Sequence, residues 1–190
     1  MEEANTLLEN GTDNYLHSKK VYLAAIEIGK TLFLSLQELD ALGHAAMLHD
    51  IGSIADLDDL TNEYYDATES HKLHPLIGAI LIEPIGNIYP ISNIIKYHHE
   101  RIDGKGYPFG LEGAEIPFLA QILGLAEYYI GLISKRSSSL GMEYEGAIFL
   151  IENSADKMFD KVIIEAFINS HEKIHKKIIQ LEAKNSSSKA

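Results

Sequence analysis

Two adjacent histidines, His98 and His99, end an apolar segment and lead directly into a loop that contains four glycines and a proline. Glycine adopts backbone angles that other residues disfavour, whereas Pro108 fixes one angle, so we expect this loop to have a defined shape. Imidazoles at a helix end beside a shaped loop favour a metal site. An ordinary linker with two surface histidines explains this stretch equally well, so the rest of the chain must decide.

The composition limits both the class of protein and the kind of metal site. The chain has 190 residues, of which 46% are hydrophobic, and this predicts one compact domain with a substantial core. It contains no cysteine, which excludes disulfides and thiolate zinc sites, so any metal must be held by His, Asp or Glu. Such ligands favour iron, manganese or a similar ion over a structural zinc finger.

The net charge argues against duplex nucleic acid as a partner. It is formally −12, and binding to a phosphate backbone depends mainly on Lys and Arg. A small anionic ligand is compatible with this charge if metal cations supply positive charge locally. The N-terminus lacks a basic segment followed by an apolar one, and no stretch approaches roughly eighteen uncharged apolar residues. We therefore expect no membrane insertion and a cytoplasmic protein.

Apolar periodicity predicts an all-α fold, without strand-like alternation or internal repeats. Ser35 and Glu38 have the spacing of a capping box, and Pro75 suits the first turn of a later helix. The acidic segment 53–70 predicts a solvated stretch with a short helix, and residues 185–190 should be frayed. The predicted helices span 2–33, 36–49, 74–82, 90–99, 118–134, 143–153 and 159–181.

Several side chains that can bind metal lie at the ends or on the apolar faces of these helices. Small and apolar residues precede His49 and Asp50, so we expect this pair at the end of a buried helix, where an unpaired Asp would be costly. Glu127 interrupts an apolar run and needs a cation in the same way. Asp50 as an ordinary turn cap and His17 as an ordinary helical histidine are the alternatives. The candidate ligands are His17, His49, Asp50, His74, His98, His99 and Glu127.

Seven nitrogen and oxygen ligands are too many for one ion but suit two, with Asp50 able to bridge them. Two cations about 3.5–4 Å apart can hold a hydroxide between them and clamp both oxygens of an in-line phosphoryl displacement. The set therefore predicts hydrolysis of a phosphodiester, with His49 and Asp50 as the central catalytic pair.

The same residues resemble a known family. His49-Asp50 is the signature pair of the HD superfamily of metal-dependent phosphohydrolases. The segment His98-His99-Glu100-Arg101, followed by Asp103-Gly104, Gly106-Tyr107-Pro108, Gly110-Leu111 and Ile116-Pro117, resembles the HD-GYP branch of that superfamily. The resemblance extends from Leu16 to Ile168 and includes Phe159-Asp160.

This resemblance implies a compact multi-helix bundle with the glycine-rich loop at the metal site. It implies a bacterial signalling enzyme that hydrolyses a cyclic dinucleotide, cyclic di-GMP first, through a metal-bridging hydroxide. Two divalent ions, iron or manganese, are implied, and a third is left open. Carried over by position, the resemblance implies six metal ligands in this chain, namely His17, His49, Asp50, His74, His98 and His99.

The chain departs from the family pattern at three places. Glu127 stands where the family usually has Asp, although Glu can still coordinate a metal. Ser53 replaces a Lys after the HD pair, and Arg136 is followed by serines at 137–139 in place of further basic residues. The resemblance implies that these basic groups grip substrate phosphates. The expected substrate contacts are Arg136, Arg101, Tyr107 and Ser53.

We expect a helical lead-in over 1–15, an HD-GYP-like domain over 16–170, and a basic helix end with a disordered tail over 171–190. The principal hypothesis is a cyclic-dinucleotide phosphodiesterase. The alternative is a catalytically impaired module that binds metal and nucleotide and signals through a protein partner on the Gly104–Gly113 loop. A purely structural helical scaffold would leave the buried His and Asp side chains unexplained.

Overall fold

The computed structural model describes residues 2–54, 72–85, 91–134 and 142–187. Within these ranges every regular element is helical, and the only extended pairings are isolated bridges. The all-α prediction is therefore confirmed. Most of the acidic segment predicted over 53–70, together with Arg136 and the serines that follow it, lies outside the described residues.

Four long helices build the body of the molecule: α1 (Glu2–Thr31), α2 (Leu36–Leu48), α6 (Phe118–Ile133) and α8 (Lys161–Ser187). The shorter elements are α4 (His74–Ile82), α5 (Ile91–Tyr97), α7 (Tyr144–Glu152) and the 3-10 turns η1 (Ile51–Ile54), η3 (Glu83–Ile85) and η4 (Gly113–Glu115). The predicted capping box of Ser35 and Glu38 is present at the start of α2.

Most helix ends lie within two residues of their predicted positions, but the end of α8 does not. This helix continues to Ser187, so the part of the predicted frayed tail that the structure describes is helical. Tertiary packing explains the difference, because Ile174 and Ile178 are buried and Lys20 of α1 lies 2.5 Å from Glu182 of α8. Contacts with α1 therefore stabilise a segment whose own composition favours fraying.

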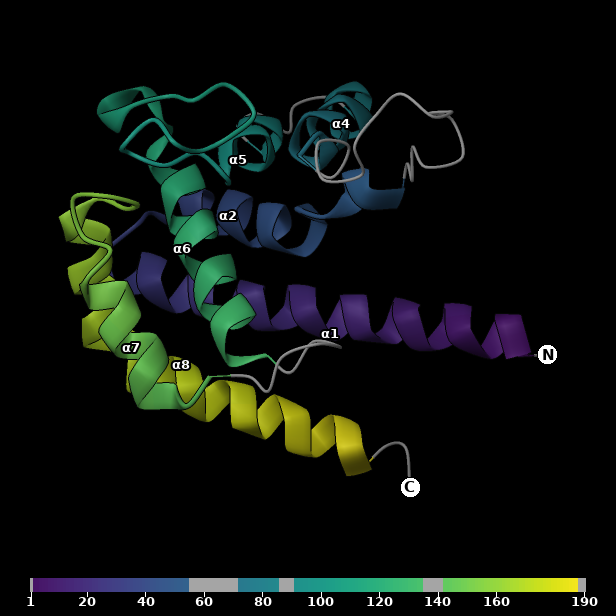
Figure 1. The fold of residues 1–190 in the computed structure, drawn as a ribbon. Helices are drawn as coiled ribbons and strands as arrows, with labels where there is room; N and C mark the ends of the chain where they lie inside the picture. The colour runs from purple at the N-terminus through teal and green to yellow at the C-terminus, as the bar shows by residue number, and fades with distance from the viewer. Residues whose placement is uncertain (1, 55–71, 86–90, 135–141, 188–190) are drawn as a thin grey trace.

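Helix α6 runs through the centre of the molecule (Figure 1). It packs against α1, α2 and α5, while α7 and α8 contact its other side. Helices α4 and α5 pair with each other at one end of the bundle, where α5 also contacts α2. None of the described helices combines the length and the apolarity that a bilayer-spanning segment requires.

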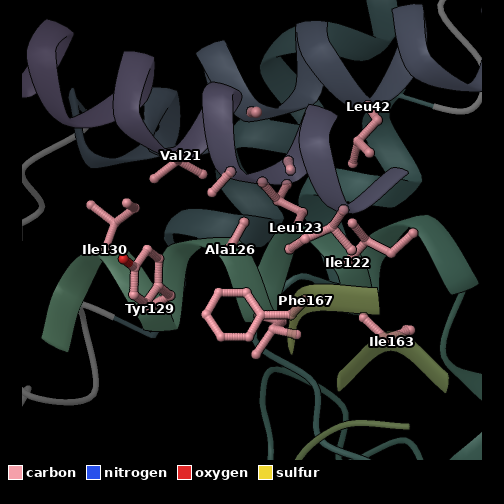
Figure 2. Packing of buried hydrophobic residues seen from close by; sticks show 14 of the residues in the cluster. Val21, Leu42, Ile122, Leu123, Ala126, Tyr129, Ile130, Ile163 and Phe167 are labelled. Carbon is pink, nitrogen blue, oxygen red and sulfur yellow. The ribbon is translucent and has the colours of Figure 1, made fainter. Parts of the chain in front are cut away.

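The hydrophobic core forms where these helices meet. Figure 2 shows Val21 of α1, Leu42 of α2, Leu123 of α6 and Phe167 of α8 converging, and each of these side chains is completely buried. Burial of one such side chain stabilises the fold by about 1.5–3 kcal/mol. The core thus joins α1, α2 and α8 to α6.

Gly52 allows the turn after α2 to pass directly over the first turn of α4. A Cβ atom at this position would lie 2.1 Å from the carbonyl oxygen of His74. The two backbones can therefore approach this closely only if residue 52 has no side chain. The contact brings the end of α2, with His49 and Asp50, beside His74.

A buried carboxylate, Glu27 of α1, fastens helix α8 to α1. Lys173 Nζ lies 2.6 Å from Oε2 of Glu27, and Lys177 Nζ lies 2.6 Å from Oε1. The Glu27 side chain is only 2% exposed. Burial raises the pKa of Glu27, but hydrogen bonds and charge from the lysines outweigh it and lower the pKa to about 2. The ionised form is therefore the one that stabilises the fold.

We predict that Glu27→Gln lowers the free energy of unfolding by about 1.5–3 kcal/mol, since hydrogen bonds to charged groups are lost. The folded pKa is depressed, so the stabilisation is present above the ordinary carboxyl value of 4.5 and is lost as the pH falls toward 2. Urea unfolding across this pH range should show a steeper loss for the wild type than for the variant. Equal slopes would contradict the assignment, and exposed Glu165→Gln is the control.

Candidate metal centre

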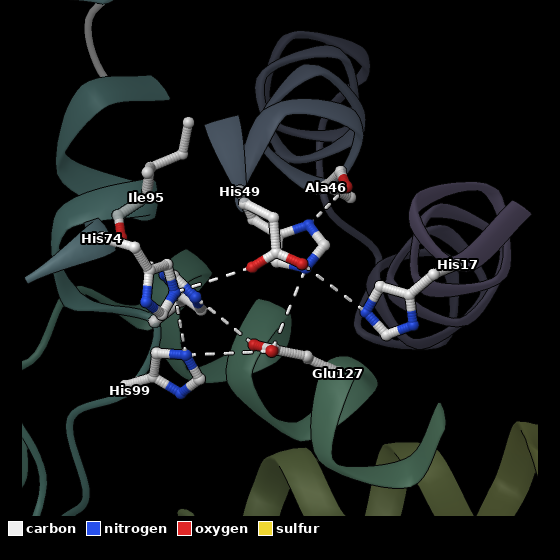
Figure 3. A network of polar contacts seen from close by, with 9 residues as sticks. His17, Ala46, His49, His74, Ile95, His99 and Glu127 are labelled. Carbon is white, nitrogen blue, oxygen red and sulfur yellow. Dashed lines mark hydrogen bonds and ion pairs between the residues drawn. The ribbon is translucent and has the colours of Figure 1, made fainter. Parts of the chain in front are cut away.

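The structure brings all seven predicted ligand side chains together at one end of the bundle (Figure 3). They come from five segments: the middle of α1, the end of α2, the start of α4, the end of α5 and the middle of α6. Four of the histidines are almost completely buried: His17, His49, His74 and His98. Their convergence was predicted from the sequence, and their role as ligands stays a prediction.

These side chains form two adjacent clusters, each with three potential ligand atoms within 4.8 Å of one another. The first comprises His17, His49 and Asp50, and the second comprises His74, His98 and His99. Three protein ligands in each cluster leave further coordination positions for water or substrate. The arrangement therefore fits two ions better than one.

Asp50 lies between the two clusters. Its Oδ2 is 3.2 Å from His49 Nε2 and 3.9 Å from His17 Nε2, while its Oδ1 is 3.6 Å from His74 Nε2. One carboxylate oxygen therefore faces each cluster. This is the geometry expected of a residue that bridges two cations.

Glu127 of α6 approaches both clusters from the opposite side. Its Oε2 lies 3.3 Å from His98 Nε2, and its Oε1 lies 3.7 Å from His99 Nε2 and 4.0 Å from His49 Nε2. Its side chain is 18% exposed. Glu127 therefore reaches the position where the family usually has the shorter Asp.

Backbone carbonyls orient two of the imidazoles toward these carboxylates. The Nδ1–H of His49 donates to the Ala46 carbonyl at 2.9 Å, and that of His98 donates to the Ile95 carbonyl at 2.5 Å. A carbonyl can only accept, so Nδ1 carries a proton in both rings, and Nε2 is the nitrogen left to bind a metal when the ring is neutral. Such an outer hydrogen bond is typical of metal-binding histidines.

The chemistry of the site requires a positive charge between these atoms. His98 Nε2 is buried, makes no hydrogen bond within the described part of the chain, and faces Glu127 Oε2. Two facing acceptors repel each other in a low-dielectric interior. A divalent cation would ligate both of them, so the residues present fit a metal ion.

The pKa values of these groups follow from the same charges. Burial and the neighbouring rings of His99 and His49 lower the pKa of His98 and keep this ring neutral. Burial also lowers the pKa of His49, but the carboxylates of Asp50 and Glu127 outweigh burial and raise it to about 9. Burial raises the pKa of Asp50, yet the surrounding histidines, His49 first, hold it well below its usual range. The carboxylates thus attract a cation even when no metal is bound.

The glycine-rich loop is held by Glu100, whose side chain is buried. Its carboxylate accepts hydrogen bonds from Phe109 N at 2.7 Å and from Leu111 N at 3.0 Å. A Cβ at residue 106 would lie 2.4 Å from Arg101 N, so only glycine fits there. The sequence analysis gave Glu100 no role, because its partners lie nine and eleven residues away. An acidic residue directly after two buried histidines was the available signal.

A cavity of about 420 Å³ opens beside the centre. His98, His99 and Glu127 form one edge of it. The glycine-rich loop forms a second edge, where Tyr107 stacks on His99 with a centroid distance of 4.6 Å. The opposite wall is largely apolar and includes Tyr128, Leu132, Met158 and Phe159.

The predicted substrate contacts differ in where they lie. Tyr107 and Arg101 line the cavity. Ser53 is exposed on η1 and is not among the residues that line it, and Arg136 lies outside the described residues. Lys105 also lines the cavity and was missed, because nothing in the sequence indicates which way this loop lysine faces.

The fold and the site define an all-helical domain with a centre of histidines and carboxylates. The family model for the HD domain matches residues 8–163, and the chain belongs to this family. The resemblance recognised in the sequence is therefore confirmed. Membership of the family implies divalent metal binding, and the two clusters could hold the ions.

Curated relatives carry names of cyclic-dinucleotide phosphodiesterases. A probable cyclic di-GMP phosphodiesterase of Vibrio cholerae is 33% identical over 147 residues, which cover 71% of this chain and 33% of the relative. The cyclic di-GMP phosphodiesterase response regulator RpfG of Xanthomonas campestris is 31% identical over 166 residues, which cover 84% and 43%. The chain thus spans less than half the length of these relatives.

A solved structure shares the fold. The crystal structure of a cyclic GMP-AMP specific phosphodiesterase of Vibrio cholerae superposes with a TM-score of 0.68 at 19% identity, covering 91% of this chain and 47% of that chain. At this identity the likeness supports the fold alone.

We predict that Asp50→Ala removes most bound metal and lowers the melting temperature, because a metal that binds only the native state stabilises it by mass action. Metal analysis of the purified protein and thermal unfolding with and without a chelator would measure both effects. His44→Ala, which alters an exposed histidine of α2, is the control. Unchanged metal content in Asp50→Ala would refute the bridging role.

A second prediction concerns Glu127. If it completes the coordination shell, Glu127→Gln should weaken at least one metal site about tenfold or more, the range typical for altered ligand environments, while the fold persists. Glu127→Asp should retain both ions because the carboxylate remains. Metal titration followed by calorimetry separates these outcomes. Full occupancy in Glu127→Gln would show that the residue is not a ligand.

Proposed function

We propose that this chain is a metal-dependent phosphodiesterase that opens a cyclic dinucleotide, with cyclic di-GMP as the first candidate. The observation that carries this proposal is the pair of ligand clusters beside a cavity, with Asp50 of the first cluster also facing His74 of the second. The cavity of about 420 Å³ lies within the size range of small-molecule sites. The names of the relatives support the choice of substrate class.

In this proposal His17, His49 and Asp50 hold one divalent cation, and His74, His98 and His99 hold the other. Glu127 contributes from the side opposite Asp50. When bound, the two cations would lower the pKa of water toward neutrality and offset negative charge on the phosphoryl oxygens. We infer iron or manganese, since the described ligands are imidazoles and carboxylates and the chain has no thiolate.

The remaining residues of the centre position these groups. The carbonyls of Ala46 and Ile95 keep the proton of His49 and His98 on Nδ1, which aims Nε2 at the reacting region. Burial, together with the charges of Glu127 and Asp50, raises the pKa of Tyr107, so its hydroxyl stays protonated. It can therefore donate a hydrogen bond to an oxygen of a bound phosphate.

The reaction is a hydrolysis that needs no further reactant. An oxygen of water bonds to phosphorus while one phosphorus–oxygen bond to a ribose breaks, and the released ribose oxygen gains a proton. The product is a linear dinucleotide. The charge that develops on the phosphoryl oxygens is placed against the cationic centre, which is the principal source of rate enhancement in such sites.

The alternative function is a binding module with impaired catalysis. Two observations favour it: Ser53 stands where the family has a Lys, and the Arg101 side chain is already paired with Asp103. Such a module would hold metal and nucleotide and signal through a protein on the Gly104–Gly113 loop, where Phe109 is 51% exposed.

One experiment separates the two functions. The purified protein is loaded with Fe(II) or Mn(II), analysed for metal, and incubated with cyclic di-GMP or 3′3′-cyclic GMP-AMP. Two bound ions with a linear product would support the enzyme. Two bound ions without product from either nucleotide would contradict the enzyme and favour the module.

We further predict that Gly131→Leu blocks the cavity without disturbing the centre. Gly131 of α6 lines the cavity, and a Cβ there meets no atom within 4 Å, so a larger side chain would occupy the space proposed for the nucleotide. The ratio kcat/KM for cyclic di-GMP should fall at least tenfold. Metal content should stay unchanged, as should cleavage of the small diester methyl 4-nitrophenyl phosphate.

Gly131→Ala is the matched control, because it changes helix propensity without filling the cavity. Either substitution should maintain or raise the melting temperature, since glycine inside a helix is about 1 kcal/mol less favourable than alanine. Full cyclic di-GMP hydrolysis in Gly131→Leu would show that the nucleotide lies elsewhere.

A further inference from the structure

A cyclic dinucleotide carries two phosphates, and the metal centre accounts for only one of them. The second phosphate keeps its negative charge throughout the reaction, in a chain whose formal net charge is −12. It needs a positive partner near the cavity. A second phosphate is present only in a cyclic dinucleotide, so the inference about its binding partner rests on the proposed function.

The charged residues around the cavity indicate which side chain can bind the second phosphate. Glu100 accepts backbone N–H groups of the loop with both carboxylate oxygens, so this carboxylate is already engaged within the loop. Arg101 forms a two-point pair with Asp103, through Nε at 3.0 Å and Nη2 at 2.7 Å. The charge of Arg101 is therefore matched within the loop, although three of its five N–H donors are left for a ligand.

Lys105 is the loop cation whose side chain makes no close hydrogen bond to an acidic side chain. Its Nζ lies 4.0 Å from Asp103 Oδ2, beyond hydrogen-bond distance, and its side chain is 76% exposed. Arg101, Lys105 and Asp103 together carry one net positive charge, which balances the single negative charge of one phosphodiester. All three N–H donors of Lys105 are available to phosphate oxygens.

The backbone at Lys105 is held by local contacts, while its side chain is exposed. Asp103 Oδ1 accepts a hydrogen bond from Lys105 N at 3.2 Å, and Gly106 packs against the backbone of Arg101. The facing wall of the cavity is largely apolar, with Tyr128, Met158 and Phe159, and the described residues of this wall include no cation. A base or ribose suits that wall, which directs the phosphate to the loop.

We propose that Lys105, supported by the Arg101–Asp103 pair, binds the phosphate that is not cleaved and thereby selects substrates with two phosphates. Lys105 does not contact the reacting phosphate in this arrangement. It acts on substrate binding and leaves the chemical step unchanged.

The test compares Lys105→Ala and Lys105→Arg with the wild type, all loaded with metal. For cyclic di-GMP, Lys105→Ala should raise KM about tenfold with kcat changed less than twofold, and Lys105→Arg should restore most of the affinity. For methyl 4-nitrophenyl phosphate, which has no second phosphate, kcat/KM should not change. The control is Lys161→Ala, another exposed lysine that pairs with an acid, Glu165, and lies outside this cavity.

Two outcomes would overturn the inference: an unchanged KM for cyclic di-GMP in Lys105→Ala, or an equal loss on both substrates. If the proposed function is wrong, the wild type would cleave the small diester but not cyclic di-GMP. This result differs from both outcomes above. In that case calorimetry measures the affinity of the wild type and of Lys105→Ala for cyclic di-GMP. Equal affinities of the wild type and Lys105→Ala would overturn the inference there as well.

Discussion

Four almost completely buried histidines and two carboxylates converge from separate helices, and the stability of this arrangement depends on positive charge among them. The neutral His98 ring and the Glu127 carboxylate present lone pairs to one another at 3.3 Å, which is unfavourable in a low-dielectric interior. Cations convert this repulsion into attraction. With ions bound, the centre would cross-link α1, α2, α4, α5 and α6.

The helical core makes this convergence possible. Helix α6 is buried along much of its length, and α1, α2 and α5 pack against it. Close backbone contact at Gly52 sets the spacing between the HD pair and His74. If a bound metal is present at about a thousand times its dissociation constant, it adds about 4 kcal/mol to the stability of the folded state. Fold and centre would then stabilise each other.

Catalysis and selectivity are separated in space. The imidazoles and carboxylates of the centre lie on or directly after helices, whereas the residues that would contact the rest of a substrate lie on the glycine-rich loop and the apolar wall. Glu100 fixes the loop through two backbone hydrogen bonds, so loop residues can change without altering the centre.

The sequence by itself determined the helices, the HD pair, the two histidines before the glycine-rich loop, and the family. These features are local: helical periodicity, capping and motif spacing depend on residues within a few positions of one another. It also predicted the seven side chains that meet at the centre, because polar groups in apolar surroundings demand partners.

Only the tertiary structure decided how these pieces meet. It divided the ligands into two clusters with Asp50 between them, gave Glu100 its partners, placed Lys105 at the cavity and left Ser53 outside it. It also continued α8 to Ser187 through contacts with α1. The physical reason is that these arrangements depend on packing between helices distant in sequence. Such packing sets the direction of each side chain, which no local pattern encodes.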